Sequence, residues 1–383
     1  MAKKDYHEDL VRYYEFQLGS MPNREGFKQA LQNTFTDDQL KVFFLLPFFG
    51  MQTEEKFCKK ASKIGLSPDE LVEKARSLIP HGVIDSYVDD EKGRMFGRAP
   101  FIALVEFQVR LQEDSPMRQA SADLMNAYIE GAVDVIPTKT PYYRVLPVQA
   151  TITGKSGGSE IPVNTVVPDD REVLPIDILS EMIKKEPLIV VADCYCRATK
   201  KLLGEDCGHP LETCFYFNDL AKVKLEAGGY ARQIDYDEAM EILWECERQG
   251  LVHNVDNCEG KITTLCNCCT CSCAVMRAVE RGQTNVGGPS RYTSSLIKDR
   301  CTVCGVCVDV CPVHALSIED GMLEIDHEQC IGCGHCVTEC PEAALHMVLR
   351  EKQPKIAADN AALMGKINRE AMIGLAKKKL FGG

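Results

Sequence analysis

Apolar residues at helical spacing dominate the first 110 residues of the chain. Three segments of this region each begin with a residue type that caps helices, and the third also has a proline at its first helical position and a glutamate that completes a capping box. The capping residues are Thr36, Thr53 and Ser67. Residues 82–102 then have the pattern of a β-hairpin that turns near Lys92–Gly93. Three helices followed by a hairpin predict a winged-helix-like domain.

Short β-type runs precede helical segments in the second half of the chain. Residues 187–193 (PLIVVAD) lead into a helical pattern at 198–204, and residues 260–264 (GKITT) stand before a second helical pattern at 274–282. Closely spaced cysteines follow each run, so we expect those thiols at strand-to-helix turns. A helix N-terminus stabilises negative charge, which makes such a turn a favourable place for thiolates.

Cysteine usage changes the picture most. The chain has 20 Cys in 383 residues, and all but Cys58 lie after position 190. The first residues lack the apolar core and cleavage site of a secretory signal. The longest apolar run, 42–51, contains Pro47 and is shorter than the roughly 20 residues of a membrane-spanning helix. We therefore expect a soluble, cytoplasmic protein without a transmembrane segment, whose clustered cysteines bind metal or carry out redox chemistry.

Two cysteine runs have the same spacing. Residues 301–312 (CTVCGVCVDVCP) and 330–341 (CIGCGHCVTECP) both read C-x2-C-x2-C-x3-C-P, the run that holds [4Fe–4S] clusters in bacterial ferredoxins. In that arrangement the fourth cysteine of each run ligates the other cluster. The predicted ligand sets are Cys301, Cys304, Cys307 and Cys340 for one cluster, and Cys330, Cys333, Cys336 and Cys311 for the other. A pair of zinc sites is the alternative, although zinc does not need a doubled run with prolines in register.

Residues 299–347 closely resemble the bacterial two-cluster ferredoxin fold. Within it we expect the fourth cysteine of each run at the start of a short helix, and between the runs a short helix and a hairpin that turns at Asp320–Gly321. The fold class that follows for the whole chain is α+β. Its predicted parts are a helical, winged-helix-like domain (1–140), an extended connector and helix (141–186), a cysteine-rich α/β domain that binds metal or clusters (187–290), a 2[4Fe–4S] ferredoxin domain (291–349) and a basic amphipathic tail (350–383).

A second group of cysteines lies upstream of these runs. Its ten members are Cys194, Cys196, Cys207, Cys214, Cys258, Cys266, Cys268, Cys269, Cys271 and Cys273. The first four have the spacing C-x-C-x10-C-x6-C, which supplies ligands for one cluster, and Arg197 is placed to donate a hydrogen bond to a cluster sulfur. One or two further iron–sulfur clusters, a zinc or mixed site, and a redox-active or persulfide-carrying array are all open. Cys246 and Cys58 lie in helical patterns and are expected in the core.

The densest stretch, 264–275 (TLCNCCTCSCAV), contains five of these upstream cysteines. A helix that began within it would bring Cys266, Cys269 and Cys273 near one face, and Cys268 and Cys271 would lie beside that face. Cys258, eight residues before Cys266, could then close the set of ligands.

The cysteine motifs together resemble a known family. A C-x-C-R pair at 194–197, the segment CGHPLETC at 207–214, the N-C-C-x-C run from Asn267 and the terminal two-cluster module are similar to multi-cluster 4Fe–4S ferredoxin-type iron–sulfur proteins of anaerobes. The resemblance covers roughly residues 170–347. It implies electron transfer beside a larger oxidoreductase.

Charge limits the choice of partners. Residues 1–110 hold 16 Lys and Arg against 17 Asp and Glu, so the N-terminal domain lacks the basic footprint that DNA binding requires. The first turn of its third helix, which would face the bases, carries Asp69 and Glu70, with Glu73 close behind. We expect no nucleic acid and favour a winged helix that docks a protein or dimerises; a DNA-binding regulator and another small helical fold are the alternatives.

The net charge of −12 favours redox partner proteins with basic docking faces, such as a flavoprotein or a larger oxidoreductase complex, in a homo- or hetero-oligomer. Residues 347–383 reverse this sign, with eight Lys and Arg against three Asp and Glu. That tail is a solvated helix, a segment that docks on a partner subunit, or one that binds an anionic membrane surface.

Our interpretation is an electron-transfer subunit that relays single electrons at low potential between a donor and an acceptor oxidoreductase in anaerobic metabolism. No catalytic residue is predicted. Two other functions are compatible with the cysteine pattern: an oxidoreductase whose active centre is the upstream group, and an iron–sulfur redox-sensing regulator.

Overall fold

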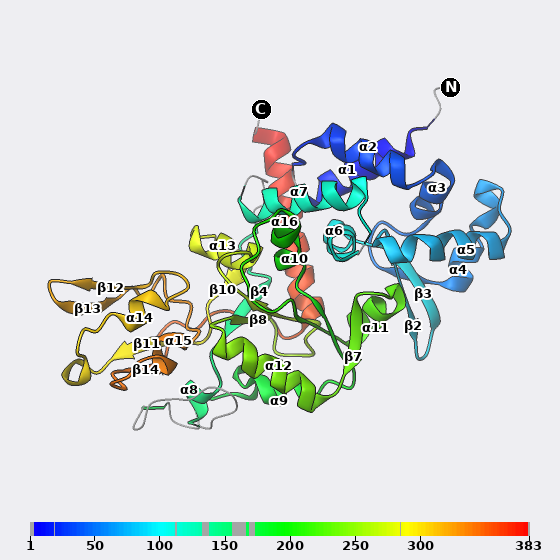
Figure 1. Cartoon of the computed structure of the whole chain (residues 1–383). Helices are drawn as coiled ribbons and strands as arrows, with labels where there is room; N and C mark the ends of the chain where they lie inside the picture. The colour runs from blue at the N-terminus through cyan, green and yellow to red at the C-terminus, as the bar shows by residue number, and fades with distance from the viewer. Residues whose placement is uncertain are drawn as a thin grey trace. The chain divides into compact units, whose positions relative to one another are not determined.

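The chain forms two compact units. Unit 1 comprises residues 1–136, 192–208 and 219–232, and unit 2 comprises residues 137–191, 209–218 and 233–383. The computed structural model describes residues 4–18, 20–111, 113–131, 138–154, 166–167, 173–283 and 285–381, and only the backbone of 375–381. Helices and strands occur in both units (Figure 1), which confirms the predicted α+β class.

Unit 1 begins with helices and a small sheet. Its elements up to residue 136 are α1 (Tyr6–Leu18), α2 (Arg24–Thr34), α3 (Asp37–Leu45), β1 (Met51–Thr53), α4 (Glu54–Cys58), η1 (Ala61–Ile64), α5 (Pro68–Leu78), η2 (Ile79–His81), β2 (Ile84–Asp89), β3 (Gly93–Arg98), α6 (Phe101–Arg110) and α7 (Pro116–Ile129). The side chains of Thr36, Thr53 and Ser67 accept hydrogen bonds from backbone N–H groups three residues on, as caps do. Strands β2 and β3 form the expected hairpin, and β1 pairs with β3.

The helix that begins after Thr53 is short. Helix α4 ends at Cys58, and the 3-10 turn η1 leads to Gly65, whose φ of 74° is left-handed and ends the segment.

Two later segments of the chain belong to unit 1. Helix α10 (Tyr195–Leu202) packs against α6 and α7, and α11 (Asn218–Ala227) follows at some distance along the chain. Ion pairs hold both helices: Lys200 Nζ lies 2.8 Å from Glu130 Oε1, and Lys224 Nζ lies 2.9 Å from Glu106 Oε1. The domain predicted at 187–290 therefore contributes residues to both units. Its boundaries were predicted from local composition, whereas the units are defined by contacts between residues that are distant in the sequence.

Unit 2 contains most of a seven-stranded sheet. The strand order is β10–β4–β8–β9–β6–β5–β7, and the chain passes between the units within β5 and β7. The strands are β4 (Tyr143–Leu146), β5 (Ile189–Asp193), β6 (Glu212–Phe217), β7 (Ala231–Ile234), β8 (Val252–Asp256), β9 (Thr264–Cys268) and β10 (Gly287–Gly288). The helices of this part are α8 (Ala150–Thr153), η3 (Pro175–Asp177), α9 (Leu179–Ile183), α12 (Tyr236–Arg248) and α13 (Ala274–Glu280). Within the connector predicted at 141–186, residues 155–165 and 168–172 lie outside the described residues.

Successive residues of the central strands face two different cores. Phe215 and Leu265, which are paired across β6 and β9, belong to an aliphatic core shared with α9 and α12. Val252 and Cys268, which are paired across β8 and β9, belong to a second core that also contains most of the cysteines between 301 and 340. The sheet thus has one ordinary apolar face and one face that continues into a core rich in thiols.

Short elements make up the next part of unit 2. They are β11 (Tyr292–Leu296), η4 (Lys298–Arg300), α14 (Val306–Asp309), β12 (Leu316–Glu319), β13 (Met322–Ile325), α15 (His335–Thr338) and β14 (Leu345–Leu349). Strands β11 and β14 pair antiparallel. Strands β12 and β13 form the hairpin expected at Asp320–Gly321, whose φ angles of 49° and 75° suit a type I′ turn.

Two local predictions for this part are wrong. The segment after Cys311 is not a short helix: residues 312–313 form a turn, and His314 has a left-handed φ of 54° that interrupts a right-handed helix. The short helices α14 and α15 contain the third cysteine of each run, Cys307 and Cys336, so the fourth cysteine follows its helix instead of starting it.

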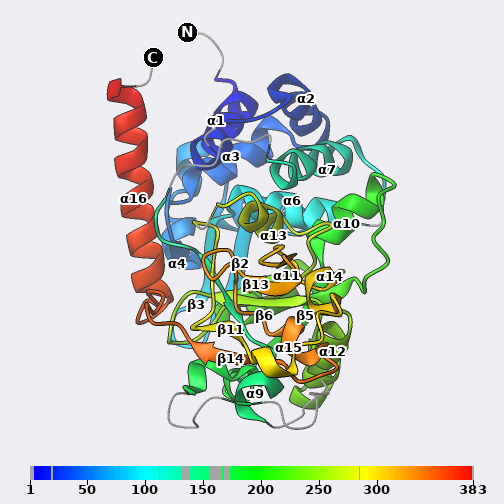
Figure 2. The same ribbon diagram turned by 90° about the vertical axis from the view of Figure 1, so that its left-hand side faces the viewer.

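Helix α16 (Asn360–Phe381) forms most of the predicted basic tail (Figure 2). The Glu370 carboxylate accepts hydrogen bonds from the backbone N–H groups of Lys139 and Thr140, at 2.7 and 2.9 Å, and from the Thr140 hydroxyl at 2.8 Å. Leu363 is fully buried, whereas the Met372 and Ile373 side chains are 55% and 51% exposed. The helix is therefore fastened to unit 2 and presents apolar side chains to solvent. Across the described residues, no helix combines the length and the apolar character needed to cross a membrane.

Candidate metal centres

The two cysteine runs fold into loops with the same backbone. Left-handed residues recur at equivalent places in both loops: Val303 and Gly332, Gly305 and Gly334, and His314 and Ala343. Gly305 and Gly334 are the N-caps of α14 and α15, where glycine adopts the left-handed conformation without strain. The internal repeat seen in the sequence is therefore a repeat of conformation as well.

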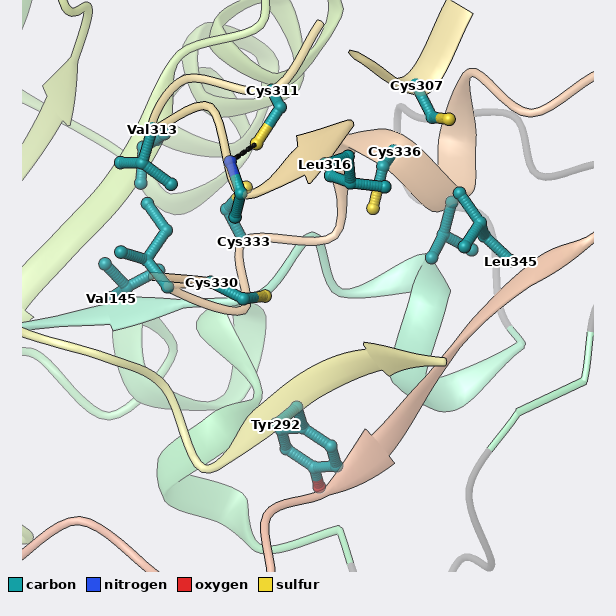
Figure 3. Close-up of a cluster of buried hydrophobic side chains, with 14 of the residues drawn as sticks. Val145, Tyr292, Cys307, Cys311, Val313, Leu316, Cys330, Cys333, Cys336 and Leu345 are labelled. Atoms are coloured by element: carbon teal, nitrogen blue, oxygen red, sulfur yellow. Dashed lines mark hydrogen bonds between the residues drawn. The ribbon is translucent and has the colours of Figure 1, made fainter. Parts of the chain in front are cut away.

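Each loop lines a cavity together with one cysteine of the other loop. A cavity of about 310 Å³, named here the inner cavity, is lined by Cys330, Cys333, Cys336 and Cys311 (Figure 3). The outer cavity, of about 320 Å³, is lined by Cys301, Cys304, Cys307 and Cys340. Apolar side chains complete both walls, among them Val313, Leu316 and Met347 on the inner cavity and Ile318, Leu323 and Leu345 on the outer one. The structure thus brings the eight thiols together in the two crossed sets that the sequence pattern defines.

Backbone N–H groups point at the crossing sulfurs. The N–H of Ala315 donates to Cys311 Sγ at 3.2 Å (dashed in Figure 3), and the N–H of Ala344 donates to Cys340 Sγ at 3.3 Å. These two bonds occupy equivalent positions of the repeat. Hydrogen bonds to sulfur stabilise a thiolate and raise the reduction potential of a cluster bound through it.

Burial makes the thiols of Cys307, Cys333 and Cys336 weaker acids in the absence of a cation. It raises the pKa of Cys307 to about 11 and the pKa of Cys333 to about 12. Cys330 is different, because hydrogen bonds from Thr293 and the backbone N–H of Ser294 overcome the effect of burial and lower its pKa. A bound metal supplies the positive charge that stabilises converging thiols as thiolates. The electrostatics therefore fit a metal site.

The two cavities differ in their access to solvent. All four cysteines of the inner cavity are buried, whereas Cys304 of the outer cavity is exposed and Cys301 is half-buried. The outer cavity is therefore the one that lies at the protein surface.

The spacing of the thiols fits a cluster better than a single zinc ion. Tetrahedral zinc with Zn–S bonds of about 2.3 Å brings its sulfurs to about 3.8 Å from one another. Among the described residues, no three of the eight loop cysteines have Sγ atoms that all lie within 4.8 Å of one another. The cavity between the thiols has room for iron and sulfide, so the donor set and its geometry fit [4Fe–4S] clusters.

The upstream run 264–275 folds differently from its prediction. Its first half is strand β9 and α13 begins only at Ala274, so the helix starts after the last cysteine of the run. Alternation along β9 places Cys266 and Cys268 on one face, instead of the helical face expected for Cys266, Cys269 and Cys273. The reason is pairing with β6 and β8, which are distant in the sequence.

Three upstream cysteines contact one another in unit 2. The Cys268 thiol makes hydrogen-bonding contacts with the Cys266 and Cys273 thiols, and these contacts raise its pKa. Cys214 on β6 lies directly opposite Cys266 on β9. Cys269 and Cys271, in the turn after β9, have Sγ atoms within 4.8 Å of each other.

Cys258 lies apart from this group, past the end of β8. Its thiol donates to the carbonyl oxygen of Lys261 at 3.9 Å, and its backbone bridges to Ala357. Burial, together with the charge of Asp256, raises its pKa to about 11. Cys266, by contrast, lies opposite Asn254 in the middle of β8. The structure therefore does not bring Cys258 to the Cys266–Cys273 run that it was expected to complete.

The remaining upstream cysteines belong to unit 1. Cys194 is the N-cap of α10 and Cys196 lies in its first turn, so both stand at the predicted strand-to-helix turn and both are buried. Arg197, the next residue, is buried as well, and Cys207 is half-buried in the loop after α10. Because Cys214 is part of unit 2, these three cysteines and Cys214 do not form one local set within either unit.

Two cysteines behave as apolar core residues. Cys246 is fully buried in α12, and Cys58 is half-buried at the end of α4, where burial raises its pKa. Both lie in helices, as their sequence patterns predict.

A buried polar network beside β9 has no signal in the sequence. His253 on β8 contacts the Asn267 Oδ1 atom through Nδ1, at 2.6 Å, and a Glu247 carboxylate oxygen through Nε2, at 3.3 Å. The Asn267 amide donates to the carbonyl oxygen of Thr213, and His335 contacts the carbonyl oxygen of Leu251 at 3.2 Å. These residues come from separate segments and follow no motif, so only the fold reveals that they meet.

The comparison with protein families bears on the two loops. Residues 293–341 match the family model of the 4Fe-4S dicluster domain, which covers all eight loop cysteines. No curated protein and no solved structure compared with the chain gives a match. The match and the cavities together show an iron–sulfur, metal-binding domain of the ferredoxin type with a general role in electron transfer.

Proposed function

We propose that this protein relays single electrons at low potential between a donor and an acceptor oxidoreductase in anaerobic metabolism. The observation that carries the proposal is the pair of cavities, each lined by four cysteines from two loops, within the matched dicluster domain. A bound [4Fe–4S] cluster supplies one-electron exchange, at potentials that reach about −400 mV and below in proteins of this type. The chain supplies the thiolates, the N–H donors to sulfur and the apolar walls that keep water from the clusters.

The surface of the ferredoxin part favours a basic partner. Residues 301–349 contain eight Asp and Glu and no Lys or Arg. On the β12–β13 hairpin, whose Ile318 lines the outer cavity, the Ile318 and Met322 side chains are 43% and 54% exposed. An apolar spot with an acidic surround next to the exposed Cys304 suits a redox partner that has a basic rim, such as a flavoprotein or a larger oxidoreductase complex.

The N-terminal part of unit 1 supports a docking role. Its order α3–β1–α4–α5–β2–β3, with the sheet order β1–β3–β2, supports the winged-helix interpretation. The first turn of α5 carries exposed Asp69 and Glu70, which repel phosphate groups. We infer that this domain docks a protein or a second copy of the chain, and that it does not read DNA.

One pair of substitutions tests the relay. Cys301→Ser combined with Cys340→Ser removes two ligands of the outer cavity and leaves the inner set intact. We expect the anaerobically purified variant to lose about four iron and four sulfide ions, and electron transfer from reduced methyl viologen to cytochrome c, a basic acceptor protein, to slow at least tenfold. Cys58→Ser, which changes a thiol outside both cavities, is the matched control.

Three results would contradict the proposal. Loss of the outer cluster with an undiminished rate of transfer would place the ferredoxin part off the electron path. Transfer to cytochrome c that does not slow as ionic strength rises would remove the role of the acidic surface. Zinc without sulfide in the wild-type protein would contradict the clusters themselves.

A further inference from the structure

The cysteine-bearing face of the central sheet is laid out like a binding site. Residues directly opposite each other in an antiparallel pair have Cβ atoms about 4.5–5.5 Å apart on the same face. Cys214 on β6 faces Cys266 on β9, and Cys268 follows two residues later on that face. Three thiols are therefore gathered by strand pairing alone.

Helix α13 brings a fourth thiol to the same place. Cys273 is its N-cap, and the backbone N–H of Cys273 donates to the Cys269 carbonyl oxygen at 3.1 Å, which closes the turn after β9. This turn folds the Cys273 thiol back into contact with the Cys268 thiol. Cys214, Cys268 and Cys273 are buried, and Cys266 is half-buried.

The residues between the cysteines on β9 point to the opposite face of the sheet, so the cysteines are not randomly placed core residues. Leu265 and Phe215 point to the aliphatic core shared with α9 and α12, while Asn267 turns to His253. Apolar and polar residues thus alternate with cysteines in strict register, so that every cysteine of β6 and β9 lies on one side. Cysteines that served only as apolar packing residues would not need to lie on the same face of the sheet.

We propose that Cys214, Cys266, Cys268 and Cys273 bind a third [4Fe–4S] cluster. The Cys268 thiol contacts those of Cys266 and Cys273, and Cys214 lies directly opposite Cys266, so the site offers the four thiolates that one cubane cluster needs. Cys268 and Cys273 also share one apolar core with the inner cavity cysteines.

Hydrogen bonds connect residues near the third site with the loop of the inner cavity. Leu251 precedes Val252, which lies opposite Cys268, and the Leu251 carbonyl oxygen contacts the ring of His335, a neighbour of Cys336. The N–H of Val148 donates to the Cys333 carbonyl oxygen at 2.8 Å. As the innermost centre of the relay, a role that rests on the function proposed above, this cluster would exchange electrons with the inner cavity and not with the surface.

The test compares two buried cysteines of the same sheet region. Cys268→Ser removes a ligand of the third site, and Cys258→Ser changes a buried thiol at the end of β8 that has no place in it. Iron, zinc and acid-labile sulfide are counted in the anaerobically purified full-length proteins, and electron paramagnetic resonance spectra are recorded during stepwise reduction. We expect Cys268→Ser to lose about four irons and one reduced-cluster signal, and Cys258→Ser to retain both.

Equal iron content in Cys268→Ser and the wild-type protein overturns the third site, and so does loss of one zinc ion without sulfide. Either result leaves methyl viologen-to-cytochrome c transfer through the ferredoxin cavities intact, which separates this failure from failure of the proposed function. Where Cys268→Ser does not fold, the wild-type count decides: about eight irons overturn the site. About twelve or more, together with a loss of four in Cys214→Ser, support it.

Discussion

Gly332 is the residue at which one added methyl group should disrupt the inner cavity. Its φ is 69°, and a Cβ atom there would lie 2.0 Å from the carbonyl oxygen of Tyr292 and 2.2 Å from Ser290 Oγ. The first of these atoms belongs to the backbone of β11, which is held in the sheet by β14 and cannot turn aside as a flexible side chain can. Gly332→Ala therefore forces the loop and β11 apart.

The cost follows from the contacts that this separation breaks. The Ser290 hydroxyl donates to the Gly332 carbonyl oxygen at 2.8 Å, and the Ser290 N–H donates to the Ile331 carbonyl oxygen at 2.9 Å. Losing two hydrogen bonds at about 1 kcal/mol each, with about 1–2 kcal/mol for a side chain in a left-handed conformation, lowers the free energy of unfolding by about 3–4 kcal/mol. That is a large fraction of the roughly 5–15 kcal/mol of a typical domain.

The measurement is urea unfolding of the anaerobically prepared protein, followed by circular dichroism and accompanied by iron analysis. Val303→Ala is the matched control, because Val303 occupies the equivalent position of the other loop with a side chain already at φ 55°. We expect the control to change stability by less than about 1 kcal/mol and Gly332→Ala to lose the inner cluster. A Gly332→Ala protein with wild-type iron content and stability would refute the argument from close approach.

Three further predictions concern other parts of the chain. Burial raises the pKa of Asp85 to about 6, so its contribution to stability is present below pH ~4 and is lost as pH rises through 6. In urea unfolding, Asp85→Asn should therefore be more stable than the wild-type protein by about 1–3 kcal/mol at pH 7.5 and should show no gain at pH 4; an equal difference at both pH values would contradict this. Glu370→Ala leaves the N–H groups of Lys139 and Thr140 without their carboxylate, so limited proteolysis should release α16 faster than in Glu370→Gln; equal rates would argue against the anchor. The acidic first turn of α5 predicts no specific complex with the DNA that flanks the protein's own gene, and a salt-sensitive nanomolar complex in a gel-shift assay would reverse this.

The parts that sequence predicts well are those in which chemistry and conformation are encoded within a few residues. The spacing of the runs at 301–312 and 330–341, with left-handed glycines between the thiols, fixes the shape of both loops regardless of their surroundings. Helix caps such as Ser67 and the hairpin at Asp320–Gly321 are equally local. In each case the deciding interactions join residues that are neighbours in the chain.

The upstream cysteines show why the rest could not be predicted. Residues 264–268 form a strand because β6 and β8 pair with them from both sides. Strand β6 lies about 50 residues earlier in the chain, and β8 lies about a dozen residues earlier. Local apolar periodicity cannot anticipate such pairing. The same holds for Lys200 and Lys224, whose ion pairs with residues about 70 and 118 positions away draw their helices into unit 1.

The repeated loops have different surroundings, and this difference predicts the direction of electron flow. The inner-cavity residue Cys330 has hydrogen-bond donors beside its sulfur, and the Arg350 guanidinium donates to its carbonyl oxygen and adds positive charge that lowers its pKa. Positive charge and donors near a ligand favour the reduced, more negative state of a cluster, so we expect the inner centre to have the higher potential and to receive electrons from the outer one.

Arg350→Gln isolates this effect, because glutamine retains hydrogen-bond donors and loses the charge. Replacing a charged hydrogen bond of about 1.5–3 kcal/mol by a neutral one of about 0.5–1.5 kcal/mol loses about 1–1.5 kcal/mol. The inner potential should therefore fall by about 40–65 mV for one electron, read from a redox titration followed by electron paramagnetic resonance. Arg248→Gln, which removes an exposed arginine at the end of α12, is the control and should leave both potentials unchanged. If Arg350→Gln shifts the outer potential instead, or neither potential, then the charge of Arg350 does not set the downhill step and the predicted direction of electron flow is wrong, because burial by itself disfavours the more negative reduced state of the inner centre.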